Sequence, residues 1–290
     1  MGLRLKFNLV LLVVFLLGLA ATGSVSWGLL QRNARDEVVR NATLMMETAL
    51  AIRSYTVAQV RPQLELQLTR AFLPQSVPAF AATETLNQLK KKYPDYFYKE
   101  ATLNPTNPRN RAADWEADLV QEFRNRAAVT ELIGERDTPT GRSLYIAHPL
   151  QIKDPACLSC HTTPEMAPAT MIKLYGPSNG FGWKLNDVVG AQVVSVPMTL
   201  PIRNAQHAFY AFMGSLTAVF ALVFVVLNVM LSQMIVHPIA RMSRAADQVS
   251  TGNFELPELR EAGRDEIALL GRAFNRMRRS LQKALQMIEG

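Results

Sequence analysis

The two cysteines of this chain lie in one short string with a histidine beside them. Cys157 and Cys160 are separated by two residues, and His161 follows directly. In the order Cys-x-x-Cys-His, each thiol can form a thioether to a haem c, and the histidine is the proximal ligand of its iron. We therefore expect one covalent haem c, attached at Cys157 and Cys160, with His161 on the iron.

Two other uses of the string stay open at this stage. A Cys-x-x-Cys pair can be a redox-active dithiol, or it can supply half of a zinc site that a partner chain completes. A thioredoxin-like pair should open a helix after a strand, whereas Pro155 and Pro164 flank this string and indicate a loop. Because the chain has only these two cysteines, it has no others for a disulfide framework. Haem attachment is the preferred interpretation.

Four further residues are candidates for contacts with such a haem. His148 lies nine residues before Cys157 in an apolar, strand-like segment. It is either the sixth ligand of the iron, another haem contact or a core residue. Arg109, Arg111 and Arg142 are either partners of the haem propionates or solvated surface residues. Weaker distal candidates are methionine and tyrosine side chains that often only fill space: Met45, Met46, Tyr55 and Met166.

Two apolar runs predict a protein that crosses a membrane twice. Residues 7–30 and 209–236 contain no charged side chain, and each run exceeds the roughly 20 residues that a helix needs to span a bilayer. The first run is alternatively a cleaved signal peptide, with small residues at 24–26 as a cleavage site. We favour an uncleaved anchor, because a polar helical pattern continues directly from it.

Basic residues beside the two runs predict their orientation. Arg4 and Lys6 precede the first run, and Arg241 and Arg244 follow the second. Lysine and arginine mark the cytoplasmic side, so both chain ends are expected there, in a bacterial inner membrane. The expected order is a cytoplasmic terminus (1–6), a first span (7–30), a periplasmic domain (31–206), a second span (209–236) and a cytoplasmic tail (237–290).

The periplasmic segment begins with a helical pattern over residues 33–60, and Pro62 predicts a bend or an end. Its apolar residues recur every three or four positions and form a narrow seam. Such a seam packs either on its own domain or on a second copy in a parallel dimer stalk. The seam residues are Val38, Ala42, Met45, Ala49, Ile52 and Thr56.

The rest of the segment alternates helix and strand patterns, which predicts an α/β domain. We expect a short helix at 83–93, a helix from 112 to 133 ended by Gly134, and strands at 143–152 and 188–196. One face of the first strand would carry Leu144, Ile146, His148, Leu150 and Ile152.

Three sequence strings carry a resemblance to a known family. They are Tyr-Lys-Glu-Ala-Thr-Leu-Asn-Pro-Thr-Asn-Pro at 98–108, the cysteine string, and the glycine-rich residues 179–184 followed by 190–197. Over most of residues 40–200 the chain resembles the PAS-like family of periplasmic c-haem sensor domains on bacterial chemoreceptors and histidine kinases. The resemblance implies a PAS-like antiparallel sheet flanked by long helices, and haem binding by Cys157, Cys160 and His161.

The sixth ligand does not follow from this resemblance. Some members of the family recruit a side chain from the membrane-proximal helix. Residues 31–70 of this chain contain neither cysteine nor histidine. That departure leaves the distal side to His148 or to a vacant site.

The tail after the second span has two helical seams joined by an extended connector. The first seam contains Ile239, Met242, Ala246 and Val249. Heptads of this kind need partner helices. Pro238 directly follows the second span, and with this proline the tail resembles a HAMP domain. The resemblance implies a parallel homodimeric four-helix bundle. The alternative is an amphipathic tail that lies on the membrane surface. The second seam, after Asp265-Glu266, contains Ile267, Leu270, Phe274, Met277, Leu281, Ala284 and Ile288.

Composition narrows the function. The net charge of +7 is spread over the chain without a dense basic stripe, so we expect no nucleic-acid partner. We expect membrane lipid to surround the two spans. Apart from a haem, no catalytic constellation stands out, so we expect no enzyme. The expected function is a homodimeric sensor of redox state or a diatomic gas. The sequence ends at Gly290 without a kinase or methyl-accepting domain. We therefore expect the output to be a separate cytoplasmic kinase or other protein; the alternative is that the chain is a truncated form. The alternatives are a membrane-anchored electron-transfer cytochrome and, more weakly, a haem enzyme.

Overall fold

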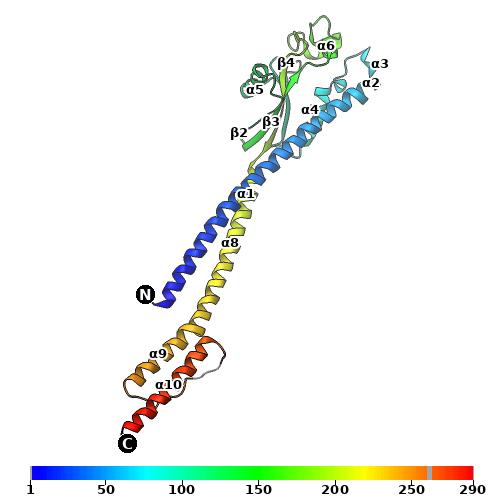
Figure 1. Cartoon of the computed structure of the whole chain (residues 1–290). Coiled ribbons are helices and arrows are strands. Elements are labelled where there is room, and N and C mark those ends of the chain that lie inside the picture. Colours follow the sequence, from blue (N-terminus) through cyan, green and yellow to red (C-terminus); the bar gives the residue numbers. More distant parts are fainter. Residues whose placement is uncertain (1, 260–262, 290) are drawn as a thin grey trace. The chain divides into compact units, whose positions relative to one another are not determined.

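The computed structural model describes residues 2–259 and 263–289, which fold into two units. One unit contains residues 28–207, and the other combines the chain before residue 28 with the chain after residue 207. The strands of the described residues all belong to the first unit (Figure 1).

A four-stranded antiparallel sheet forms the centre of the unit 28–207. Its central strands are β3 (Gly141–Gln151) and β4 (Val188–Pro197), which pair Ile146 with Val194. These two strands confirm the predictions at 143–152 and 188–196. The strand order is β1 (Phe97–Thr102), β4, β3 and β2 (Leu132–Thr138).

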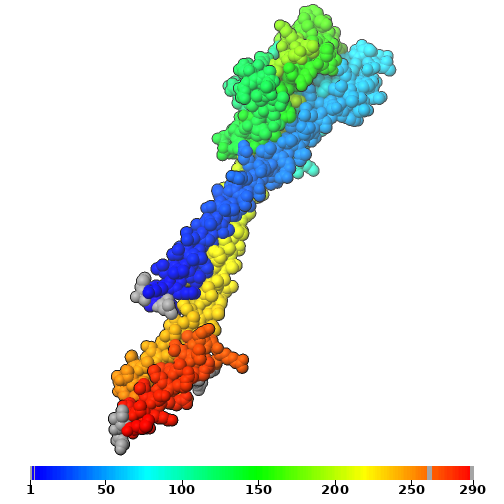
Figure 2. Space-filling view, viewed as in Figure 1, coloured from blue at the N-terminus to red at the C-terminus, as the bar shows by residue number. Residues whose placement is uncertain are grey.

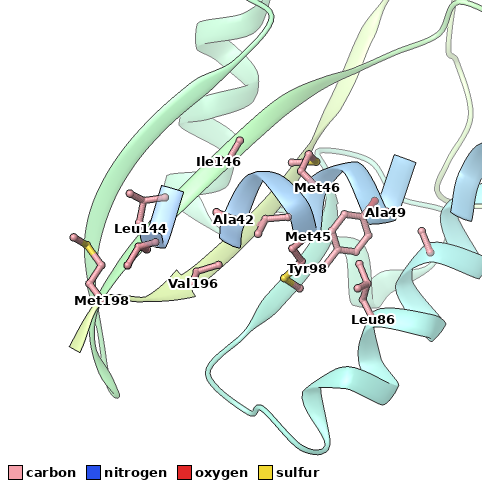
Figure 3. Packing of buried hydrophobic residues seen from close by; sticks show 13 residues of the cluster. Ala42, Met45, Met46, Ala49, Leu86, Tyr98, Leu144, Ile146, Val196 and Met198 are labelled. Atoms are coloured by element: carbon pink, nitrogen blue, oxygen red, sulfur yellow. The ribbon is translucent and has the colours of Figure 1, made fainter. Parts of the chain in front are cut away.

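The second half of helix α1 (Leu3–Tyr55) covers one face of this sheet. Val38, Ala42 and Ala49 are fully buried there. Figure 3 shows the cluster that they form with residues of β3 and β4 and with Leu86 of α4 (Pro78–Lys90). The predicted seam therefore packs on its own domain. The alternative, a dimer stalk built on this seam, is wrong for this structure, because the seam residues already pack against the apolar face of the sheet.

Helix α5 (Asp114–Asn125) covers the opposite face of the sheet. Val120 and Phe123 are buried against alanine and valine side chains of β3 and β4. The helix begins where Glu116 accepts a hydrogen bond from the Ala113 backbone N–H at 2.8 Å. The sheet thus lies between helices, which agrees with the expected mixture of helix and antiparallel sheet.

The predicted helix from 112 to 133 is wrong in its second half. The helix ends at Asn125, and residues 132–138 form β2, in which Gly134 pairs with Tyr145. A side chain at Gly134 would collide with the Tyr145 ring, with its Cβ only 2.4 Å from the hydroxyl oxygen. Gly134 therefore does not end a helix; its lack of a side chain lets the Tyr145 ring pack directly on the backbone of β2.

Helix α1 ends at Tyr55, a few residues before Pro62, where the sequence predicts a bend or an end. A five-residue π-helix, η1 (Thr56–Val60), follows Tyr55, and the short helices α2 (Arg61–Gln63) and α3 (Glu65–Leu68) come next. Pro62 has no backbone N–H to continue the helical ladder. Beyond this bend, the Phe72 N–H donates to Thr170 Oγ1 of α7 (Ala169–Tyr175) at 2.7 Å.

Two helices are long and apolar enough to cross a membrane. They are Arg4–Gln63, with a mean hydropathy of 2.4 in its best window, and Thr199–Ser250, with 2.5. The second comprises α8 (Thr199–Met230), the π-helix η5 (Leu231–Val236) and α9 (His237–Ser250). These two helices contain the predicted spans 7–30 and 209–236, and they are candidate membrane helices by length and composition.

The tail of the chain ends in helix α10 (Glu266–Glu289). Asn275 of α10 holds the preceding connector, since it accepts from the Leu259 N–H at 3.2 Å and donates to the Leu259 carbonyl at 3.1 Å. Several positions of the predicted seam are exposed in the single chain, including Leu270 at 53% and Met277 at 51%. In Figure 2, α10 appears in orange and red.

Candidate cofactor site

The cysteine string forms a short helical turn after β3. Residues 155–157 form a 3-10 turn, and α6 (Leu158–His161) continues it. Asp154 starts the turn, because its carboxylate accepts from the Ala156 N–H at 2.8 Å. Since residues three and four apart share one face of a helical turn, both thiols and the imidazole can face one ligand. The prediction of a loop is wrong in this detail.

Both cysteines are free thiols and half-buried. Burial, together with the nearby Asp154, raises the pKa of the Cys157 thiol, while Arg53 and Arg61 act in the opposite direction. Cys157 is therefore a neutral thiol at neutral pH. The two arginines come from the end of α1 and from α2, so the string lies within electrostatic reach of these helices.

His161 is held on several sides by a group of residues that we call the histidine cradle. Its Nδ1 lies 2.7 Å from the Gly180 carbonyl oxygen and 3.4 Å from Thr106 Oγ1. The ring stacks on Trp183, with centroids 4.0 Å apart and planes 14° apart. Asn104 completes the cradle, since its side chain accepts from the Gly180 N–H at 3.2 Å and donates to the Phe181 carbonyl at 3.4 Å.

The cradle defines which nitrogen of His161 is available. Only a protonated Nδ1 can donate to the Gly180 carbonyl, so Nε2 carries the lone pair in the neutral ring. Burial lowers the pKa of His161, although the bond to Gly180 opposes the shift. The imidazole is therefore neutral at neutral pH, which is the form that binds metals.

A second polar group, the ion-pair cluster, lies buried between α1 and the sheet. Arg53 Nη1 contacts Glu100 Oε1 at 2.5 Å, and the Tyr98 hydroxyl donates to the same oxygen at 2.9 Å. Gln192 Nε2 donates to the Tyr98 hydroxyl at 3.4 Å. Burial and the neighbouring Glu100 raise the pKa of Tyr98, which therefore remains a neutral donor. Arg53, Tyr98, Glu100 and Gln192 form the cluster.

Sequence reasoning missed this cluster. Glu100 is 1% exposed, and among the described residues its Oε2 atom has no hydrogen-bond partner. A charged residue inside a short edge strand gives no periodic signal, and its partner Arg53 lies 47 positions earlier in the chain. One available signal was the isolated Arg53 between apolar positions of the helical seam.

The other predicted haem contacts have protein partners of their own. His148 Nε2 pairs with Glu131 at 3.0 Å, and Arg142 pairs with Glu135 at 2.9 Å. Arg109 pairs with Glu84 and lies over the Phe80 ring.

One of the predicted arginines reaches the neighbourhood of His161. Arg111 donates to Asn179 at 3.4 Å, directly before Gly180. Of the weaker distal candidates, Met45 and Met46 of α1 are buried in the core between this helix and the sheet, whereas Tyr55 and Met166 are both 61% exposed.

Comparison with known sequences agrees with this architecture. A HAMP-domain model matches residues 230–283, and a model described as Tll0287-like matches residues 31–197. The chain thus has the architecture of a sensor domain followed by a HAMP domain, with two candidate membrane helices. Because the second match covers more than half of the sequence, the chain belongs to the Tll0287-like family. The resemblances seen in the sequence strings are confirmed.

Individual relatives cover only parts of the chain or resemble it distantly. The sensor histidine kinase WalK of Bacillus subtilis (strain 168) is 31% identical over 104 residues, which are 36% of this chain and 17% of that protein. The chain thus spans less than a fifth of that relative. Among solved structures, the cyanobacterial heme-protein Tll0287 is 13% identical with a TM-score of 0.43, covering 56% of this chain and 95% of that one.

Proposed function

We propose that this chain is a two-pass membrane sensor that holds one covalent haem c in its outer domain and signals through a HAMP dimer. The observation that carries the proposal is the oriented imidazole of His161, which the Gly180 carbonyl holds at 2.7 Å so that Nε2 is the metal-binding atom. Two free thiols lie on the same helical turn. The donor set therefore fits haem c.

Each residue of the string has a separate task in this proposal. Cys157 and Cys160 anchor the haem through thioethers, and His161 binds its iron. Trp183 packs on the imidazole and limits its rotation. Arg111, beside the cradle, is the best placed of the predicted propionate partners. When bound, the haem supplies an iron that changes charge on oxidation and can bind a diatomic gas.

The proposed route of the signal uses the helix that reaches the haem domain. Helix α1 is continuous from Leu3 to Tyr55, and Arg53 near its end is bound to Glu100 of β1. The exposed seam of α10 needs partner helices, as a HAMP dimer provides. A HAMP bundle with two packings of similar energy can convert a small movement into an output. Similarity to a sensor histidine kinase supports a kinase as the output partner.

The proposed location is the inner membrane of a bacterium, with residues 31–206 in the periplasm and both chain ends in the cytoplasm. The basic residues beside the spans support this orientation. Alkaline phosphatase fused near Arg136 should be active, and the same fusion near Arg264 should be inactive. The reverse pattern would contradict both the orientation and haem attachment.

Haem attachment is tested on the full-length protein made in cells with a cytochrome c maturation system. The haem should stay on the protein after acid–acetone extraction, and the pyridine haemochrome spectrum should indicate two thioethers. Cys160→Ala should shift that spectrum to one thioether, whereas the neighbouring Ser159→Ala should not. Haem that is fully extractable, or a colourless protein, would refute the proposal.

Signalling is separated from electron transfer by a change in the HAMP seam. Phe274→Asp puts a carboxylate into the proposed bundle, where burial of a charge is costly. We expect this variant to keep a normal haem spectrum and to lose redox-dependent crosslinking between cysteines introduced at Leu281 of two copies. Met287→Asp, at a position outside the seam, is the control. If the protein with Phe274 unchanged crosslinks to the same extent with oxidised and reduced haem, the result would favour an electron-transfer cytochrome.

A further inference from the structure

We infer that Asn104 is a positioning residue for the proposed iron ligand: it fixes the peptide whose carbonyl orients His161, and through that bond it tunes the redox potential of the haem. The inference rests on the proposed function, because it assigns His161 to the iron. Asn104 follows β1, and it reaches across 76 sequence positions to Gly180. No contact between Asn104 and the haem itself is required.

The two bonds of Asn104 hold the backbone on both sides of the 180–181 peptide. Its Oδ1 accepts from the Gly180 N–H at 3.2 Å, and its Nδ2 donates to the Phe181 carbonyl at 3.4 Å. The Gly180 carbonyl between these groups is the acceptor for His161 Nδ1 at 2.7 Å. The direction of that carbonyl is therefore set by a side chain from another part of the fold.

Close packing keeps the glycine peptide in this position. Gly180 has a φ of +87°, a conformation that glycine adopts at no steric cost. A Cβ at this position would lie 2.0 Å from Thr106 Oγ1 and 2.8 Å from Thr106 Cα. The 180–181 peptide thus lies directly on the turn that carries Asn104 and Thr106, with no room for a side chain between them.

The bond to Gly180 affects the chemistry of the ligand as well as its direction. A histidine that donates its second N–H to an acceptor becomes a more basic ligand. A more basic ligand stabilises the oxidised iron, so the bond lowers the redox potential. If Asn104 is removed, the carbonyl is free to turn away, the imidazole becomes a weaker donor, and the potential rises.

The test compares Asn104→Ala with the unmodified full-length protein after haem attachment. At a fixed applied potential, we expect the ratio of oxidised to reduced haem to fall at least severalfold and up to about tenfold. A tenfold change equals about 59 mV for a one-electron couple. The iron–histidine stretching band, recorded by resonance Raman after photolysis of the CO complex, should move to lower frequency. A merely structural role would not move this band.

Asn107→Ala is the matched control, since Asn107 lies in the same turn but accepts from the Arg109 N–H. It should leave both readouts unchanged. Asn104→Ser is the milder second variant, whose shorter side chain cannot grip both backbone groups, and it should give a smaller change in the same direction. If alanine prevents haem attachment, the serine variant decides the question.

The outcomes separate this inference from the proposed function. Attached haem with an unaltered potential and an unaltered iron–histidine band in the asparagine variants would overturn the role of Asn104 alone. Equal changes in Asn104→Ala and Asn107→Ala would also overturn it, because the effect would then belong to the turn as a whole. Failure of the unmodified protein to attach haem would instead refute the proposed function.

Discussion

The histidine cradle and the ion-pair cluster are two polar regions of the same unit, residues 28–207, and they are built in opposite ways. The cradle uses neutral backbone and amide groups around His161, which lies on a short turn. The cluster buries a full charge pair, Arg53 with Glu100, between α1 and β1. One region orients a ring, and the other ties a helix to the sheet.

This difference has an energetic meaning. A neutral hydrogen bond contributes about 0.5–1.5 kcal/mol, so the bonds of the cradle can define a direction without dominating stability. Removal of one partner from a buried ion pair costs about 3–5 kcal/mol, because the remaining charge is left without compensation. We therefore expect changes in the cluster to act mainly on folding, and changes in the cradle to act mainly on the haem.

The largest expected effect is that of Arg53→Ala. This change leaves the Glu100 carboxylate buried without its cation, and we expect the free energy of unfolding to fall by about 3–5 kcal/mol. Urea unfolding of the haem-loaded protein in detergent, followed by circular dichroism, measures the loss. Arg35→Ala is the control, because the exposed pair of Arg35 with Glu135 should contribute about 0–1 kcal/mol.

A double variant sharpens this prediction. Arg53→Met together with Glu100→Gln removes both charges, and an apolar or neutral replacement of a buried pair is often close to neutral in stability. The double variant should therefore be more stable than Arg53→Ala. If Arg53→Ala and Arg35→Ala were equally mild, Arg53 would not be needed to hold α1 on the sheet.

An intermediate effect is expected at Gly180. Gly180→Ala forces a Cβ against Thr106, and we expect a loss of about 1–3 kcal/mol from this overpacking, beyond the strain of the positive φ. Gly176→Ala is a matched control, since Gly176 has a φ of +81° but open space around its missing Cβ. Only the change at Gly180 should also shift the redox potential. Equal unfolding losses for the two variants would argue against close packing in the cradle.

The smallest effect is expected from His148→Ala. The pair of His148 with Glu131 is partly exposed, and we expect its removal to cost less than about 1 kcal/mol. The haem spectrum should remain unchanged if this pair is the role of His148. The prediction from the sequence, that His148 is the sixth ligand, requires instead a change from low-spin to high-spin haem in this variant. Optical and EPR spectra of the oxidised protein distinguish these results.

Parts of the fold with a strong local pattern were predictable. The central strands β3 and β4 carry long apolar stretches, and both predicted strands lie within two residues of the observed bounds. The sequence predicts no strand at β2 and extends a helix over its first two residues, because β2 is an edge strand with charged residues and no regular alternation. Strand β1, also at an edge, contains the buried Glu100 and gave no apolar signal.

What the sequence by itself determined are the features encoded by neighbouring residues. These are the haem-type string at 157–161, the two apolar runs and the heptad seams of the tail. Each follows from spacing alone, since covalent geometry and helical periodicity act over a few residues.

Only the tertiary structure decided which distant residues meet. It brings Asn104 to Gly180 and Gly180 to His161, and it joins Arg53 to Glu100 across 47 positions. It also resolved the ambiguity of the α1 seam in favour of the domain's own sheet. The physical reason is that a buried polar group needs a partner at hydrogen-bond distance. The folded path of the whole chain, rather than sequence spacing, determines which partner is within that distance.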